Sequence, residues 1–137
     1  MVWDPFAQKN ITKVEMVQRR YVRFAMRDFR CTSSVANMLQ QLKWITLQER
    51  RAQQRVFMAY SIIHGLIDIP NSYFIPVCGP STRGNPEKFR VPFARTQLYQ
   101  KTFFPDATRL WNSLPPSLVN STSLEIFKRE VQHMRLR

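Results

Sequence analysis

The chain has 137 residues, a length that suits one domain, and a net charge of +12 from 21 Lys and Arg against 9 Asp and Glu. Hydrophobic residues make up 44% of it and aromatic residues 12%, so the composition favours a folded protein over a disordered one. The charge favours polyanionic partners, with nucleic acid ahead of an anionic membrane surface. The alternative is a basic protein whose charge only opposes aggregation.

The composition also excludes several classes of protein. The two cysteines, Cys31 and Cys78, are too few for a disulfide framework or a zinc knuckle, and they predict buried thiols in an intracellular protein. No apolar run approaches the roughly 20 residues that a membrane-spanning helix needs. The first residues contain no apolar stretch of a secretory signal. We therefore expect an intracellular protein, in the nucleus or the cytoplasm, without a membrane partner.

The hydrophobic pattern predicts a mainly α fold of about five helices in a single domain that covers residues 1–137. Residues 1–69 are expected to be helical. Residues 70–104 should form a Pro-rich loop with a short β-hairpin or an extended arm, and Pro92 would lie at its edge. Residues 105–137 are expected to be helical again.

The first helix should run from about Asn10, a good N-cap, to Asp28. Apolar residues at helical spacing predict one buried face, formed by Ile11, Val14, Val17, Tyr21, Phe24 and Ala25. A second short helix should follow Ser33 or Ser34, after which Trp44 closes the turn. Phe24 and Trp44 are expected to belong to the core.

A third helix should span residues 47–64. Thr46 and Glu49 form a capping box at its start, Gly65 suits the position after its end, and Pro70 prevents continuation.

A short helix should then start near Pro105 or Asp106 and end at Pro115 and Pro116. Thr122 and Glu125 predict a second capping box for the last helix. That helix should bury one face, formed by Leu124, Phe127, Val131 and Met134. The stretch from residue 103 onwards is expected to build one core cluster from Phe103, Phe104, Trp111, Leu114 and Phe127.

No catalytic constellation is recognisable. No acidic residues are spaced to share a metal ion, and His64 and His133 lie at helix ends. The sequence contains no Gly-rich phosphate loop and no nucleophile elbow. Cys31 has no nearby histidine. We therefore expect no enzymatic activity, no metal site and no cofactor.

The positive signal is a basic stripe on the first helix. Four arginines recur at spacings of three, four and three, with Lys13 at the edge of their face: Arg20, Arg23, Arg27 and Arg30. Arginines on one face can bind phosphates through paired hydrogen bonds, and neither Glu15 nor Asp28 is expected within the stripe. The alternative is a solvated face with a local Glu15–Arg19 ion pair.

A second basic set is interleaved with aromatic residues, a pattern that suits single-stranded nucleic acid. The basic residues are Arg83, Lys88, Arg90, Arg95 and Lys101, of which Arg90, Arg95 and Lys101 are the candidate contacts. The aromatic residues are Phe89, Phe93, Tyr99 and Phe103. The alternative is that these rings only attach the segment to the core.

Six segments in order, "VWDP", "VEMVQRRYVRF", "MLQQLKWITLQERR", "YSIIHGLIDIP", "ARTQLYQKTFFPDATRLWNSLP" and "SLEIFK", resemble the C-terminal, post-thumb region of non-LTR (LINE-type, jockey-like) retrotransposon reverse transcriptases. The resemblance covers Val2 to Lys128. It implies element RNA and target DNA as partners, together with an upstream polymerase domain. The family's Tyr/Phe-Ala-Asp-Asp motif and its endonuclease domain are absent here, and the chain lacks the C-terminal Cys/His cluster of some related elements.

The sequence thus predicts a non-catalytic fragment of a reverse transcriptase that acts as a basic RNA- and DNA-binding accessory module. The alternative is a structural or protein-interaction module that braces the polymerase thumb, or a non-functional relic.

Overall fold

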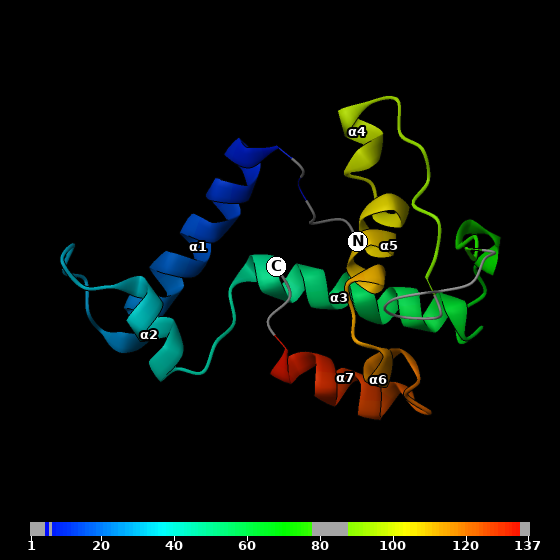
Figure 1. Cartoon of the computed structure of the whole chain (residues 1–137). Helices are drawn as coiled ribbons and strands as arrows, with labels where there is room; N and C mark the ends of the chain where they lie inside the picture. Colours follow the sequence, from blue (N-terminus) through cyan, green and yellow to red (C-terminus); the bar gives the residue numbers. More distant parts are fainter. Residues whose placement is uncertain (1–4, 6, 78–87, 135–137) are drawn as a thin grey trace. The chain divides into compact units, whose positions relative to one another are not determined.

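The computed structural model describes residues 5, 7–77 and 88–134 (Figure 1). These residues form seven α-helices and one short 3-10 helix, and their β-structure is limited to one isolated bridge. The mainly α fold is therefore confirmed. The helices beyond the expected five include two of four residues each, α4 (Gln97–Gln100) and α6 (Pro116–Val119).

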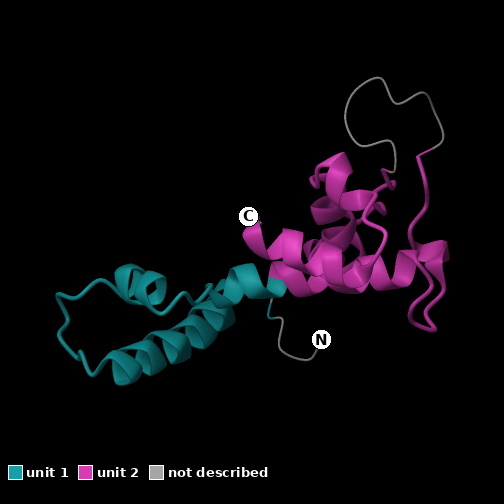
Figure 2. Ribbon diagram, turned by 90° about the horizontal axis from the view of Figure 1, so that it is seen from below, with its two compact units in different colours: residues 1–51 teal, residues 52–137 magenta. Residues whose placement is uncertain are grey.

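The chain divides into two compact units, residues 1–51 (unit 1) and residues 52–137 (unit 2), coloured separately in Figure 2. The boundary falls within α3 (Leu47–Ile63). The length of the chain predicts a single domain. Whether the two units act as one domain is not tested by the structure, so this stays a prediction.

Unit 1 consists of α1 (Gln8–Met26), α2 (Val35–Gln41) and the first turn of α3. Helix α1 begins before the predicted cap, because Gln8 and Lys9 are themselves good helix formers and extend it towards the N-terminus. Its N-cap is Ala7, whose carbonyl accepts the Asn10 N–H at 2.9 Å. The predicted cap at Asn10 is therefore wrong, whereas Ser34 does occupy the N-cap position of α2.

The end of α1 also differs from the prediction. Arg27 adopts a left-handed conformation with a φ of 52°, and the Asp28 N–H donates to the Arg23 carbonyl at 3.1 Å. These features form the hydrogen-bonded helix end that usually carries glycine. The helix therefore stops at Met26, two residues before Asp28.

The apolar face predicted for α1 is not the buried face of this helix. Val17, Tyr21 and Phe24 are 65%, 61% and 70% exposed, Ala25 is exposed as well, and Ile11 and Val14 are half-buried. The fully buried residue of α1 is Val22, which the prediction did not include. Residues 22 and 24 differ by about 200° around a helix, so they point to nearly opposite sides. The prediction of Phe24 as a core residue is therefore wrong.

Trp44 is also not a core residue. Its N–H donates to the Leu39 carbonyl at 2.8 Å, which closes the turn after α2 as predicted. Its ring, however, is 39% exposed and stacks on Tyr21 instead of entering a core. A turn residue presents its side chain towards the surface unless another element covers it.

Both predicted end signals of α3 are found in the structure. The Thr46 hydroxyl accepts the Glu49 N–H at 3.2 Å. At the other end Gly65 has a φ of 65°, and the Leu66 N–H donates to the Ser61 carbonyl at 2.8 Å. This is the glycine-containing helix end that the sequence predicted.

Unit 2 contains the rest of α3 and the elements that follow it. These are the 3-10 helix (Asn71–Tyr73), α4, α5 (Phe103–Asn112), α6 and α7 (Leu124–His133). Helix α5 begins earlier than predicted, because Pro105 fits inside the first turn, where a backbone N–H has no helical partner. Helix α7 is capped by Ser123, whose hydroxyl accepts the Ile126 N–H at 3.3 Å. The predicted capping box at Thr122 is therefore off by one residue.

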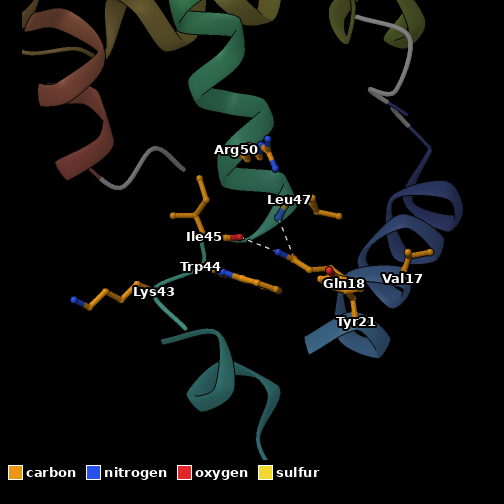
Figure 3. Close-up of a pocket in the computed structure, with 8 residues that line it drawn as sticks. All are labelled: Val17, Gln18, Tyr21, Lys43, Trp44, Ile45, Leu47 and Arg50. Carbon is orange, nitrogen blue, oxygen red and sulfur yellow. Dashed lines mark hydrogen bonds between the residues drawn. The ribbon is translucent and has the colours of Figure 1, made fainter. Parts of the chain in front are cut away.

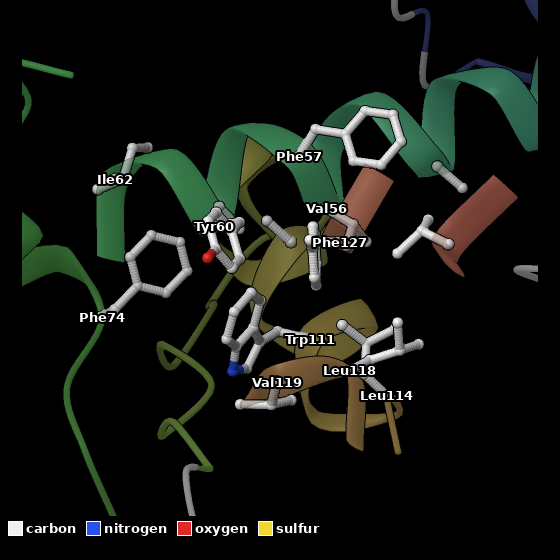
Figure 4. Close-up of a cluster of buried hydrophobic side chains, with 14 residues drawn as sticks. Val56, Phe57, Tyr60, Ile62, Phe74, Trp111, Leu114, Leu118, Val119 and Phe127 are labelled. Carbon is white, nitrogen blue, oxygen red and sulfur yellow. The ribbon is translucent and has the colours of Figure 1, made fainter. Parts of the chain in front are cut away.

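The core of unit 2 confirms the predicted cluster (Figure 4). Trp111 and Phe127 are fully buried, Leu114 nearly so, and Phe103 and Phe104 pack against them while partly exposed. The buried face of α7 is likewise as predicted, with Leu124 and Met134 at its margins.

The described part of the segment between residues 70 and 104 contains less β-structure than predicted. One antiparallel bridge joins Pro76 and Phe89, flanked by hydrogen bonds from the Val77 N–H to Lys88 O (3.0 Å) and from the Arg90 N–H to Ile75 O (2.7 Å). Residues 78–87, including Cys78 and Arg83, lie outside the described residues. The backbone around Pro92 is irregular and forms no strand.

Asn112 completes this bridge from the other side. The Phe89 N–H donates to Asn112 Oδ1 at 2.9 Å, and Asn112 Nδ2 donates to the Phe89 carbonyl at 2.7 Å. The side-chain amide therefore pairs with the Phe89 backbone as a third strand would. Trp111 and Asn112 are adjacent in the sequence and have different roles. Trp111 contributes its ring to the core, and Asn112 binds the Phe89 backbone through its side-chain amide.

Candidate nucleic-acid interface

The exposed cations of α1 form the first part of the candidate site. Lys13 and Arg20 are exposed and Arg23 is half-buried. Lys9, which the sequence analysis did not select, is exposed on the same side. At 100° per residue these four positions fall within an arc of about 80°.

Arg27 and Arg30 do not extend this face. Both lie beyond the last helical residue, and the chain leaves the helix in a left-handed turn at Arg27. Arg30 Nε lies 3.3 Å from Asp28 Oδ1, and Arg23 Nη1 donates to the Arg30 carbonyl at 2.6 Å. The prediction of four equivalent arginines, free of acidic neighbours, is therefore wrong for Arg30, which shares its charge with Asp28.

Asp28 organises the turn that follows α1. Its carboxylate accepts the Ser33 hydroxyl at 2.6 Å and the Arg30 N–H at 3.1 Å. The Ser33 hydrogen bond, then the backbone hydrogen bond and the charge of Arg30, hold the pKa of Asp28 below its ordinary value of 3.8. The carboxylate is thus used to shape the turn.

Glu15 is directed away from the cationic face. Its Oε1 accepts the Gln48 N–H at 3.0 Å and lies 3.5 Å from Arg51 Nη2. The carboxylate therefore sits at the N-terminus of α3, where the helix dipole favours a negative charge. The alternative Glu15–Arg19 pair is not formed among the described residues. Lys13 and Arg20 consequently have no acidic partner in the part of the chain that the structure describes.

An open pocket of 580 Å³ lies beside α1, within unit 1 (Figure 3). Its lining residues come from α1, from the turn after α2 and from the start of α3: Val17, Gln18, Tyr21, Lys43, Trp44, Ile45, Leu47 and Arg50. The rings of Tyr21 and Trp44 stack with their centroids 5.6 Å apart and their planes inclined by 16°. The pocket therefore has an apolar, aromatic lining with two cationic side chains.

Gln18 fixes the geometry of this pocket. Its Nε2 donates to the Ile45 carbonyl at 2.9 Å, and its Oε1 accepts the Leu47 N–H at 3.2 Å. Both hydrogen bonds appear as dashed lines in Figure 3. One side chain of α1 thereby holds the segment that carries Trp44. Lys43 and Arg50 were not predicted as site residues, although the sequence places one of them on each side of "WITLQE".

The second basic set lies in unit 2. Arg90, Arg95 and Lys101 are all exposed. The aromatic residues among them divide into two groups. Phe89 and Phe103 pack against the core, as the alternative interpretation predicts, whereas Phe93 is 89% exposed and Tyr99 is exposed as well.

The described side chains that could take part in catalysis or bind a metal ion are not gathered in one place. Among the described residues no three His, Cys, Asp or Glu side chains gather as a metal site. His64 packs on Tyr60 with ring centroids 4.1 Å apart, and Asp106 pairs with Arg55 at 2.9 Å. Cys31 is exposed, so the prediction of a buried thiol is wrong at this position, which lies in the turn after α1. No described helix is both long enough and apolar enough to cross a membrane.

No protein-family model, curated protein or solved structure matches the chain. The resemblance to reverse transcriptases therefore stays a prediction, and the function is argued from the site.

Proposed function

We propose that this chain is a non-catalytic, intracellular module that binds nucleic acid through unit 1. The observation that carries the proposal is the cationic face of α1, on which Lys13 and Arg20 are exposed without an acidic partner among the described residues. The two acidic residues nearest in sequence, Glu15 and Asp28, form hydrogen bonds within the unit. A face of this kind attracts phosphates and releases their counterions.

The net charge of +12 supports the same proposal, because it raises the local concentration of polyanions around the whole molecule. The resemblance to the C-terminal region of non-LTR reverse transcriptases names element RNA and target DNA as the polyanions and an upstream polymerase domain as a neighbour. Binding of this kind positions a protein on the phosphate backbone without reading its sequence.

A salt titration of binding to a single-stranded RNA tests the proposal. Replacing Lys13 and Arg20 with Gln should flatten the plot of log affinity against log salt by about 1.4, since each single-strand phosphate contact contributes about 0.7. The matched control is Lys128→Gln with Arg129→Gln, two exposed cations of α7, which removes the same charge. If both double variants lose affinity equally, only net charge is acting. If the unaltered chain does not bind RNA, the proposal is wrong.

The second candidate function is to brace a polymerase domain. The exposed apolar side chains of Phe24 on α1 and Phe29 in the turn after it favour it, since such side chains are typical of a protein interface. Replacing both with Ser should then abolish association with a reverse transcriptase domain of the family, measured by sedimentation, and leave the salt dependence of RNA binding unchanged.

A further inference from the structure

We infer that the pocket beside α1 is a stacking site for one unpaired base of a single-stranded nucleic acid. This inference rests on the proposed function and specifies the type of strand that unit 1 takes. The pocket volume of 580 Å³ lies within the range of about 300–1,000 Å³ typical of small-ligand sites.

The aromatic pair supplies the contact surface. Tyr21 is 61% exposed and Trp44 39% exposed, although burial of such large rings would be favourable. Because their centroids are already 5.6 Å apart, a base does not fit between them. It adds instead to an outer face of the stack, as bases do on the aromatic platforms of single-strand-binding proteins.

The charges around the pocket select a nucleic acid over an apolar peptide. Lys43 and Arg50 both line the pocket and are exposed, and neither has an acidic partner among the described residues. Lys13 and Arg20 add positive charge on the neighbouring face of α1. An apolar helix docked here would leave these cations without compensation, whereas the phosphates that flank a stacked base neutralise them.

The pocket is built to accept any base. Gln18 is the one side-chain amide in its lining, and both ends of that amide are hydrogen-bonded to backbone groups of Ile45 and Leu47. Reading a base needs a polar group directed at its edge. With stacking and phosphate contacts alone, affinity depends on the presence of an unpaired base and much less on its identity.

The test compares a single-stranded oligouridylate with an oligonucleotide of the same length and backbone that carries abasic sites. Fluorescence anisotropy should show binding to the abasic strand about tenfold weaker, and binding to a duplex of the same length weaker than to the single strand. Trp44→Leu should remove the difference between intact and abasic strands. The matched control is Phe29→Leu, an exposed ring of unit 1 that does not line the pocket and should keep the difference.

A second measurement does not depend on the folding of the Trp44 variant. In a Trp3→Phe background the remaining indoles are Trp44 and the fully buried Trp111. Intact strands should quench tryptophan fluorescence saturably, whereas abasic strands should not. Equal affinity for intact and abasic strands, or binding without quenching, overturns the stacking site and leaves the proposed function standing. Absence of any binding overturns both.

Discussion

Units 1 and 2 use their aromatic residues in opposite ways. In unit 2 the rings of Tyr60, Trp111 and Phe127 pack on one another, and the hydroxyl of Tyr60 donates to the Ser121 carbonyl at 2.8 Å. In unit 1 the buried hydrophobic residues among those described are Val22 and Met38, and its described rings are exposed, namely those of Tyr21, Phe24, Phe29 and Trp44. The difference indicates that unit 2 is organised by its own core, whereas unit 1 leaves much of its apolar surface exposed, as the proposed interface requires.

Replacing Trp111 and Trp44 with alanine, one at a time, should show this difference most clearly. Trp111→Ala removes a fully buried ring and should destabilise unit 2 by about 3–5 kcal/mol. Trp44→Ala removes a half-exposed ring and should change the stability of unit 1 by about 1 kcal/mol, mostly through its stack with Tyr21. Hydrogen exchange resolved by peptide measures each unit separately. Comparable losses of protection in both units would remove the contrast.

A smaller effect is expected at the two hydrogen bonds that join Asn112 of α5 to the Phe89 backbone. Asn112→Ala leaves the N–H and the carbonyl of Phe89 without their side-chain partner and should cost about 2 kcal/mol. Protection from exchange should fall at residues 88–90 and change little in unit 1.

Asn112→Asp separates the two hydrogen bonds. The aspartate keeps an acceptor for the Phe89 N–H, but it has no N–H to donate to the Phe89 carbonyl, so we expect it to be less stable than the unaltered chain. If the aspartate variant is as stable as the unaltered chain, the second hydrogen bond contributes nothing.

The smallest predicted effect lies in the turn after α1 and depends on pH. The folded-state pKa of Asp28 lies below its ordinary value of 3.8, so its carboxylate stabilises unit 1 at pH values above 3.8. That contribution should be lost as the pH falls below 3.8 through the folded-state pKa. Asp28→Asn should reduce the acid dependence of exchange at residues 27–34. An unchanged acid profile in this variant would show that the turn does not depend on the carboxylate.

The sequence predicted those features that depend on local periodicity or on one special residue. The buried face of α7 follows from the 3.6-residue repeat, and the end of α3 follows from Gly65, whose φ is positive. The capping of α7 was predicted one residue early, because Thr122 and Ser123 offer the same hydroxyl chemistry and tertiary packing decides between them.

The candidate site was less predictable. The apolar positions of α1 spread over a wide arc, and tertiary packing decides that Val22 is buried and Phe24 is not. The arginine stripe needs helical geometry as far as Arg30, beyond the end predicted at Asp28, whereas a left-handed Arg27 ends the helix at Met26. A non-glycine residue in that conformation leaves no signal in the sequence. The pocket joins residues about 25 positions apart, which periodicity does not detect.

The two hydrogen bonds of Asn112 affect which substitutions position 112 tolerates. Its side-chain amide takes the place of a peptide group. A residue at this position therefore needs one donor and one acceptor at the distance from the α5 backbone that the asparagine side chain provides. In a library selected only for folding, position 112 should therefore accept few residue types, whereas its exposed neighbour Ser113 should accept many. A polar position that resists substitution is usually assigned to catalysis or binding. At position 112 the same resistance would arise from folding alone, so a search for functional residues by mutational intolerance would select the wrong unit.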